Sequence, residues 1–218
     1  MILQFERILP SIPYILEGVQ VTLFYTVTSL TLGFFLGIIL AMMKVGSFKI
    51  LQLFAQFYTS IFRGTPLLLQ LTLIYFASPE ITGYKISAWE AGVLAFSLNS
   101  GAYVSEIIRG GILAVDRGQT EAALSLGVSY FSMMKDIILP QAIKNILPAL
   151  VNEAVNLLKE SAMVSVIGGT DILKRANVVA SEKYIYFEPL IVAGALYYVL
   201  VMILSSLAKI LERKMARS

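Results

Sequence analysis

The chain has 218 residues, of which 57% are hydrophobic and only 14% charged, and its net charge is +3. A soluble domain carries about a quarter charged residues, so this composition excludes an ordinary soluble protein and predicts one polytopic membrane domain over residues 1–218. The basic residues lie at the ends of apolar segments and not on one stripe, which argues against nucleic-acid binding. The chain has no Cys and no His, which excludes thiolate and imidazole chemistry and the commonest metal ligands.

The apolar segments predict five transmembrane helices. They fall at residues 18–43, 50–78, 88–108, 143–167 and 189–208. The first and last are free of charge and long enough to cross a bilayer, and residues 1–17 suit an interfacial lead-in. The second holds Arg63-Gly64-Thr65-Pro66 at its centre, where proline predicts a break or kink. The fourth contains so many Asn, Lys and Glu residues that a hydropathy window alone would miss it.

The basic residues also orient these spans. The tail after residue 208, the turn at 44–49 and the polar segment 116–140 fall on one side, which the positive-inside rule makes cytoplasmic. The N-terminus is then outside and the C-terminus is cytoplasmic. Three cations of the outer polar loop go against the rule, namely Lys174, Arg175 and Lys183. Because the loop that holds them, 168–188, is rich in polar residues, we expect it to be structured.

The polar segment 116–140 has the signals of two short helices. Thr120 suits the N-cap of the first, and Glu121 then places a carboxylate in the first turn, where the helix dipole favours it. Gly127 suits a left-handed helix stop, and Ser129 is well placed to cap a second helix. That helix runs toward Pro140, which cannot continue it without strain. Taken alone, the pattern predicts a capped helical loop between two spans.

This segment and its surroundings also resemble a known family. Glu121-Ala122-Ala123, then Gly127, then Ile138-Leu139-Pro140 are similar to the EAA loop of ABC importer permeases. Further similarity, to the polar amino acid permeases of that family, lies at 62–70, 102–112 and 157–168. The resemblance implies an all-α polytopic protein with the type I ABC importer permease fold, whose loop is a coupling helix that docks on a cytoplasmic ATPase. The coupling residues that it implies are Glu121, Ala122, Ala123, Leu124 and Gly127.

The same resemblance implies partners. An importer of this family has two permease subunits, two cytoplasmic ATP-binding cassette subunits and an extracytoplasmic solute-binding protein. We expect this permease to pair with a second copy of itself in the cell membrane. The chain has no GxxxxGK[ST] phosphate loop, so ATP and Mg²⁺ belong to the separate ATPase subunit. We therefore expect a transport subunit that is no enzyme and that binds no cofactor or metal of its own.

Polar side chains inside the predicted spans are the candidates for substrate binding. A charge at membrane depth costs roughly 3 kcal/mol and needs a partner or a water-filled cavity. Glu153, Asn156 and Glu160 stand at i, i+3 and i+7 and therefore share one face of the fourth span. The remaining candidates are Asn99, Ser100 and Arg63.

Structural roles remain open for several of these residues. Glu153 could be an interhelical polar contact, and Glu160 could pair with Lys159, Arg63 or backbone. The Arg63 guanidinium could satisfy carbonyls freed by the break in the second span. Glu106 and Arg109 suit an ion pair at the cytoplasmic boundary.

Glu153 and Asn156 depart from the family pattern, in which these positions are often an amide and a small residue. A carboxylate facing the translocation path favours a cationic substrate by charge pairing. We therefore expect arginine, lysine or histidine ahead of glutamine or glutamate. The alternatives are an ABC permease for glutamine, glutamate or another small polar solute such as an osmolyte, a membrane-embedded enzyme that uses Glu153 and Glu160, and a secondary transporter. The lack of His and Cys disfavours the enzyme, and the lack of inverted repeats disfavours the secondary transporter.

Overall fold

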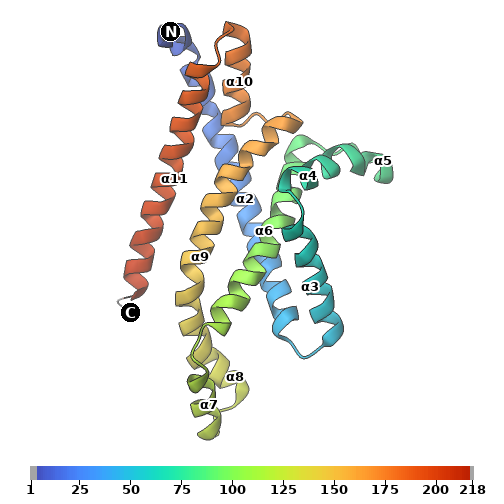
Figure 1. Cartoon of the computed structure of the whole chain (residues 1–218), viewed down its shortest axis with the longest axis vertical. Helices are drawn as coiled ribbons and strands as arrows, with labels where there is room; N and C mark the ends of the chain where they lie inside the picture. The colour runs from blue at the N-terminus through green and yellow to red at the C-terminus, as the bar shows by residue number, and fades with distance from the viewer. Residues whose placement is uncertain (1–3, 217–218) are drawn as a thin grey trace.

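The computed structural model describes residues 4–216, and every element within that range is helical (Figure 1). Residues 1–3 of the expected lead-in and Arg217 of the basic tail lie outside the described residues. The elements in chain order are α1 (Phe5–Ile8), η1 (Leu9–Ser11), α2 (Ile12–Val45), α3 (Lys49–Gly64), α4 (Leu67–Thr72), η2 (Leu73–Ala77), α5 (Ser78–Thr82), α6 (Ala88–Leu113), α7 (Arg117–Ser125), α8 (Tyr130–Met133), η3 (Met134–Ile138), α9 (Leu139–Glu160), η4 (Ser161–Ile167), α10 (Ile172–Lys183) and α11 (Phe187–Ala216).

Within residues 4–216, three segments are long and apolar enough to cross a membrane: Phe5–Val45, Ala88–Leu113 and Phe187–Ile210. A fourth forms if α3 and the segment Leu67–Thr82 are counted as one broken span. α9, the fourth of the five predicted helices, is 22 residues long and lies between α6 and α11. Its polar residues make it less apolar than these segments, so the count of five spans stays a prediction.

The helices do not share the ends of the expected spans, as the first and the fourth show. The first expected span starts at residue 18, but α2 begins at Ile12 with Pro13 in its first turn, where proline is tolerated because its missing N–H has no helical partner to lose. The fourth expected span runs to residue 167, but α9 ends at Glu160. The tighter 3-10 helix η4 follows it, and the residue that caps η4 is Gly168, which has a φ of 90°.

The break in the second span is confirmed. α3 ends at Gly64, Thr65 is extended with φ −122° and ψ 148°, and the chain beyond Pro66 turns by 100°. The segment α4–η2–α5 therefore runs across the long helices (Figure 1). The polar loop expected at 78–87 instead begins as the helix α5 and turns at Gly83, where φ is 71°.

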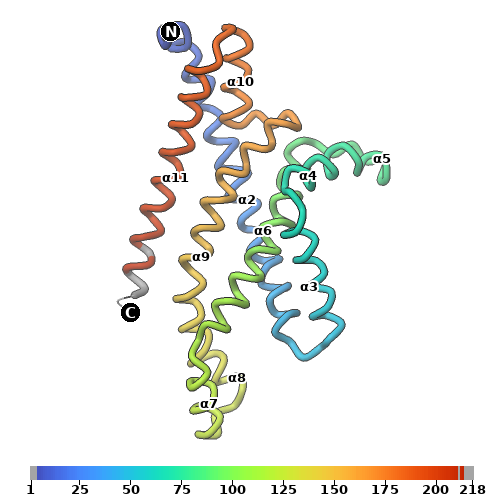
Figure 2. Tube along the Cα trace, in the orientation of Figure 1, coloured from blue at the N-terminus to red at the C-terminus, as the bar shows by residue number. Residues whose placement is uncertain are grey.

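α2 and α6 form the most extensive helix pair in the fold, and they run in the same direction (Figure 2). The buried face of α2 carries small side chains, which let the two backbones approach closely. A Cβ added at Gly33 would lie 2.9 Å from the Cβ of Ser100, and one added at Gly37 would lie 2.5 Å from Cγ1 of Val104. Glycine at these two positions therefore fixes the distance between α2 and α6.

Replacing Gly37 by Ala should lower the stability of the folded chain by about 1–3 kcal/mol, the usual cost of overpacking. The midpoint temperature of denaturation of the purified chain in detergent measures this loss. Gly110→Ala, on α6, is the matched control because nothing lies within 4 Å of the added Cβ. Equal midpoints for the two variants would contradict the close packing of α2 on α6.

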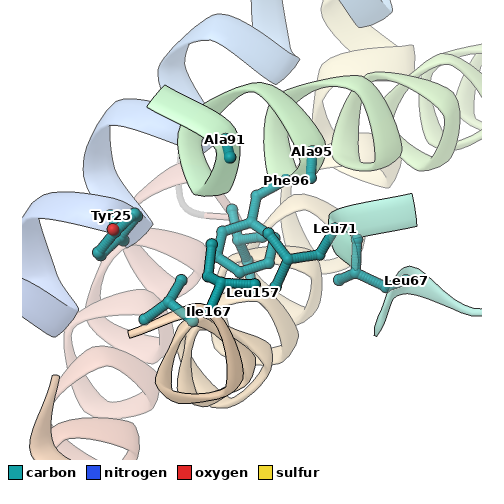
Figure 3. Close-up of a cluster of buried hydrophobic side chains, with 9 residues drawn as sticks. Tyr25, Leu67, Leu71, Ala91, Ala95, Phe96, Leu157 and Ile167 are labelled. Atoms are coloured by element: carbon teal, nitrogen blue, oxygen red, sulfur yellow. The ribbon is translucent and has the colours of Figure 1, made fainter. Parts of the chain in front are cut away.

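A buried apolar cluster joins α2, α4, α6, α9 and η4 (Figure 3). Phe96 of α6 and Leu71 of α4 are fully buried in it beside Leu157 of α9. The hydroxyl of Tyr25, on α2, donates to the carbonyl of Ala88 at 3.1 Å. The cluster holds α4, in the second half of the broken span, against both α6 and α9.

The polar loop 168–188 is structured, as expected, and contains α10. Asp171 caps α10 through the backbone N–H groups of Leu173 and Lys174 and accepts a hydrogen bond of 2.7 Å from the hydroxyl of Tyr197. Arg175, one of the cations expected to go against the positive-inside rule, pairs with Glu17 at 2.6 Å and donates to the carbonyl of Tyr14. This cation joins α10 to α2, which gives it a local structural role.

Candidate functional site

A buried carboxylate lies between α6 and α9. The side chain of Glu153 on α9 is 9% exposed, and its Oε1 accepts a hydrogen bond of 2.8 Å from the hydroxyl of Ser100 on α6. Gly33 of α2 packs against Ser100, and a side chain larger than that of glycine at position 33 would displace Ser100. No described salt bridge includes Glu153, so the described residues leave its charge without a cationic partner.

The other candidates on α9 have different environments. Asn156 is exposed and Glu160 is half-buried, and neither makes a described side-chain hydrogen bond. Asn152 and Lys159 are also exposed. Ser100 and Glu153 are thus brought together directly, whereas Asn156 and Glu160 lie on the same helix without a contact that joins them to this pair.

Asn99 belongs to a second network, which fastens the break between α3 and α4. Its amide donates to the carbonyl of Phe62 at 2.9 Å and to Oε1 of Gln70 at 3.1 Å. The amide of Gln70 in turn reaches the carbonyls of Phe62 and Thr65. Gln70 is a functional candidate that the sequence reasoning missed, although it lies only four residues beyond Pro66.

The expectation that Arg63 satisfies the carbonyls freed by the break is wrong, since the amides of Gln70 and Asn99 occupy that place. Arg63 instead lies over the ring of Tyr103, 5.3 Å from its centroid, with its Nη1 3.9 Å from Glu106. Its side chain is 43% exposed, and no described bond joins it to Glu153. A direct contact of Arg63 with substrate therefore stays a prediction.

Glu106 is the centre of a charged cluster. The expected pair with Arg109 is present at 2.8 Å, and Lys44 of α2, which sequence reasoning did not connect to it, is closer at 2.6 Å. The Lys44 side chain is only 2% exposed and also donates to Ser105. A buried cation of this kind requires its carboxylate, because breaking such a pair leaves an uncompensated charge.

At one end of the molecule, α7, the turn at Gly127 and α8 form a protruding segment that we call the tip (Figure 1). α7 begins earlier than expected, at Arg117, and its N-cap is Asp116, whose side chain accepts from the backbone of Gly118. The expectations that Thr120 is the N-cap and that Glu121 lies in the first turn are therefore wrong. Asp116 is an equally good capping residue, and capping there lets α7 start immediately after the turn that ends α6.

The second half of the tip agrees better with the sequence. Gly127 has a φ of 74° and Ser129 caps α8 through the backbone of Ser132, so both predictions are confirmed. The helix does not stop at Pro140, however: the π-helical turn η3 leads directly into α9, and Pro140 lies in the first turn of α9. The wide turn makes room for the ring, and a first-turn proline lacks only an N–H that the helix does not need.

The tip exposes apolar side chains that the chain itself leaves uncovered. Leu126 is 83% exposed, and Tyr130 and Phe131 are also well exposed. Of the five expected coupling residues, Glu121, Ala122, Leu124 and Gly127 are exposed. Ala123 is different, because it is buried in the core of the chain beside Met133 and Ile138. Its small side chain therefore lets α7 pack on α8 and η3 within the chain.

Among residues 4–216, no group of three or more acidic side chains is placed to hold a metal ion.

Comparison with known proteins gives consistent results. The model of the family described as "Binding-protein-dependent transport system inner membrane component" matches residues 33–217. A Rickettsia felis protein named as a putative glutamine transport system permease, GlnP, is 58% identical over 206 residues, which are 94% of each chain. The arginine transport system permease protein ArtQ of Bacillus subtilis is 54% identical over 213 residues, covering 98% of this chain and 97% of ArtQ.

One solved structure is similar over nearly the whole chain. It is described as the crystal structure of an amino acid ABC transporter with histidines. The matching chain is 46% identical to this one, and the superposition covers 98% of this chain and 100% of that chain with a TM-score of 0.93.

Proposed function

This chain belongs to the family of binding-protein-dependent transport system inner membrane components and is an amino acid ABC permease of the type I importer fold, and we propose that its substrates are basic amino acids, arginine first among them. Its relatives are transport subunits and not enzymes, and ATP hydrolysis belongs to a separate ATPase. The family thus removes the enzyme and the secondary transporter from the alternatives. Its apolar helices make it a multi-pass inner-membrane protein.

The observation that carries the proposal is the buried carboxylate of Glu153. It accepts one hydrogen bond, from Ser100, and has no cation beside it in any described salt bridge. A guanidinium or ammonium group that pairs with it would supply the missing charge and further hydrogen bonds. Glu160, on the same helix, would engage the α-amino group of the ligand and Asn156 its α-carboxyl group, with Arg63 at the border of the site.

The relatives support two substrates. ArtQ is named for arginine and the similar solved transporter is described with histidines, and both favour a basic amino acid. The Rickettsia felis relative is named for glutamine, and a neutral amide would also find an acceptor in Glu153. The charge of Glu153 decides our preference, because an ion pair in a low-dielectric site is stronger than a hydrogen bond to a neutral amide.

A second copy of this chain is the proposed permease partner. α9 exposes polar side chains along most of its length, and they cannot face lipid without a large cost. These residues are Asn145, Asn152, Asn156 and Lys159. In a homodimer they would face a cavity shared by the two copies, in which Glu153 and Glu160 of each copy receive the substrate.

The remaining partners follow from the family, which implies ATPase subunits and a solute-binding protein. The tip lies at the end of the molecule opposite the N-terminus (Figure 1), which supports a cytoplasmic tip, a cytoplasmic C-terminus and an external N-terminus. We propose that the exposed residues of the tip dock on the ATPase, with Glu121 paired to a basic residue there. Closure of the ATPases on ATP would then move the tip and rock the spans between outward and inward openings.

The purified complex of this permease with its ATPase tests the substrate. Titration with L-arginine, L-lysine, L-histidine and L-glutamine is made without the solute-binding protein, whose own selectivity would mask that of the permease. Tighter binding of arginine than of glutamine is the expected result. Tighter binding of glutamine would transfer the proposal to the alternative substrate.

A further inference from the structure

Two adjacent residues of α6 make hydrogen bonds in different directions. Ser100 donates to Glu153 of α9, and Asn99 donates to the carbonyl of Phe62 and to Gln70. Phe62 lies in the last turn of α3 and Gln70 belongs to α4, so Asn99 contacts both sides of the break in the second span. One turn of α6 therefore joins the candidate substrate carboxylate to that break.

The break depends on these amide contacts for a physical reason. In an uninterrupted helix the carbonyl of Phe62 would accept from the N–H of residue 66, but Pro66 has none. That carbonyl instead receives Nε2 of Gln70 at 2.9 Å and Nδ2 of Asn99 at 2.9 Å. Gln70 and Asn99 are both buried, so the loss of either amide would leave buried polar groups short of a hydrogen-bond partner.

Open space lies beside the backbone at the break. A Cβ added at Gly64 would meet nothing within 4 Å, and Thr65 is extended between two helices. Beyond the break, Leu71 of α4 shares the buried cluster with Leu157, which lies one turn after Glu153 on α9. A displacement of α9 at Glu153 can therefore reach α4 through Ser100 and Asn99 on one side and through this apolar contact on the other.

We propose that Asn99 and Gln70 are positioning residues that transmit occupancy of the Glu153 site to the α3–α4 break, so that a bound amino acid changes the orientation of α4. The proposal rests on the proposed function, since it takes Glu153 as the substrate carboxylate. It assigns the Asn99–Gln70 pair a role in the transport cycle and not in contact with the ligand.

A thiol on α4 can report this movement, because the chain contains no cysteine and one introduced thiol labels a single site. Leu68 is 40% exposed and lies on α4 just past the break. The rate at which a maleimide labels Leu68→Cys is measured in the assembled permease–ATPase complex, with the permease band resolved by electrophoresis. L-Arginine should change this rate about fivefold or more, the usual range for coupled sites.

The amides that join the Glu153 site to the break are then removed in the chain that carries Leu68→Cys. Asn99→Leu keeps the size of the side chain and deletes the amide, and Gln70→Met does the same on α4. Both should bind L-arginine nearly as the parent does but lose the change in labelling rate. Ser97→Ala is the matched control: Ser97 is buried on the same helix and its hydroxyl has no hydrogen-bond partner among the described residues, so the response should persist. Gln70→Met carries the test if Asn99→Leu fails to assemble with the ATPase.

The outcomes separate the two hypotheses. A parent reporter that does not respond to bound arginine, or a full response in Asn99→Leu or Gln70→Met, would overturn the link and leave the substrate site intact. A Glu153→Gln reporter that still binds arginine and responds like the parent would instead remove Glu153 from the substrate site. Loss of the response in Ser97→Ala would also overturn the link, because the effect would then not be specific to the amides.

Discussion

Glu153→Gln should weaken arginine binding to the permease–ATPase complex by about 10–100-fold. This range follows from the roughly 1.5–3 kcal/mol contributed by a hydrogen bond to a charged group, with about 1.4 kcal/mol for each factor of ten. Glutamine binding should change far less, because the amide of the variant can still pair with a neutral amide. The preference between the two amino acids should therefore narrow or reverse in equilibrium titrations.

Glu153→Asp is the matched variant for this experiment. It keeps the negative charge but shortens the side chain, which lengthens the distance to Ser100 and to the ligand. Arginine affinity in this variant should lie between the parent and Glu153→Gln. If Glu153→Gln instead kept the parent preference for arginine over glutamine, Glu153 would be an interhelical contact and not the specificity residue.

Gly127→Val should uncouple transport from ATP hydrolysis, while the complex still assembles. Gly127 has a φ of 74° and open space around it, so the variant meets no steric clash outside its own backbone. The cost is the left-handed conformation itself, about 1–2 kcal/mol for a residue with a Cβ and more for a β-branched one. The turn between α7 and α8 should relax to another shape and displace Leu124 and Leu126 from the ATPase.

Two variants control this experiment. Gly127→Asn should retain most of the coupling, because Asn tolerates the left-handed region. Gly83→Val introduces the same strain far from the tip, since Gly83 has a φ of 71° and equally open surroundings, and should leave coupling unchanged. The measured quantity is the amount of amino acid taken up per ATP hydrolysed in proteoliposomes. If Gly127→Val takes up as much amino acid per ATP hydrolysed as the parent, the turn has no coupling role.

The local features of the sequence predicted the local structure well. Pro66 lacks an N–H and must interrupt a helix, Gly127 accepts a left-handed φ at little cost, and Ser129 precedes a helix that needs a cap. Each of these predictions depends on one residue and its immediate neighbours, and each is confirmed. The family resemblance supplied the fold class, which no single residue could.

The failures arose where distant segments decide the outcome. Asp116 and Thr120 are both suitable caps, and the position of α6, which ends three residues before Asp116, favours the first. In the sequence, Gln70 is a single polar residue in an apolar run, and only the folded break brings the Phe62 carbonyl beside it. Lys44 and Glu106 are 62 positions apart, and only the parallel packing of α2 on α6 brings them together.

A structure of the assembled importer with L-arginine bound tests the substrate site most directly. We expect the guanidinium within hydrogen-bond distance of the Glu153 carboxylate, between α6 and α9, with Ser100 still donating to the same side chain. Density for arginine in another part of the membrane domain, with Glu153 bonded only to protein, would contradict the assignment.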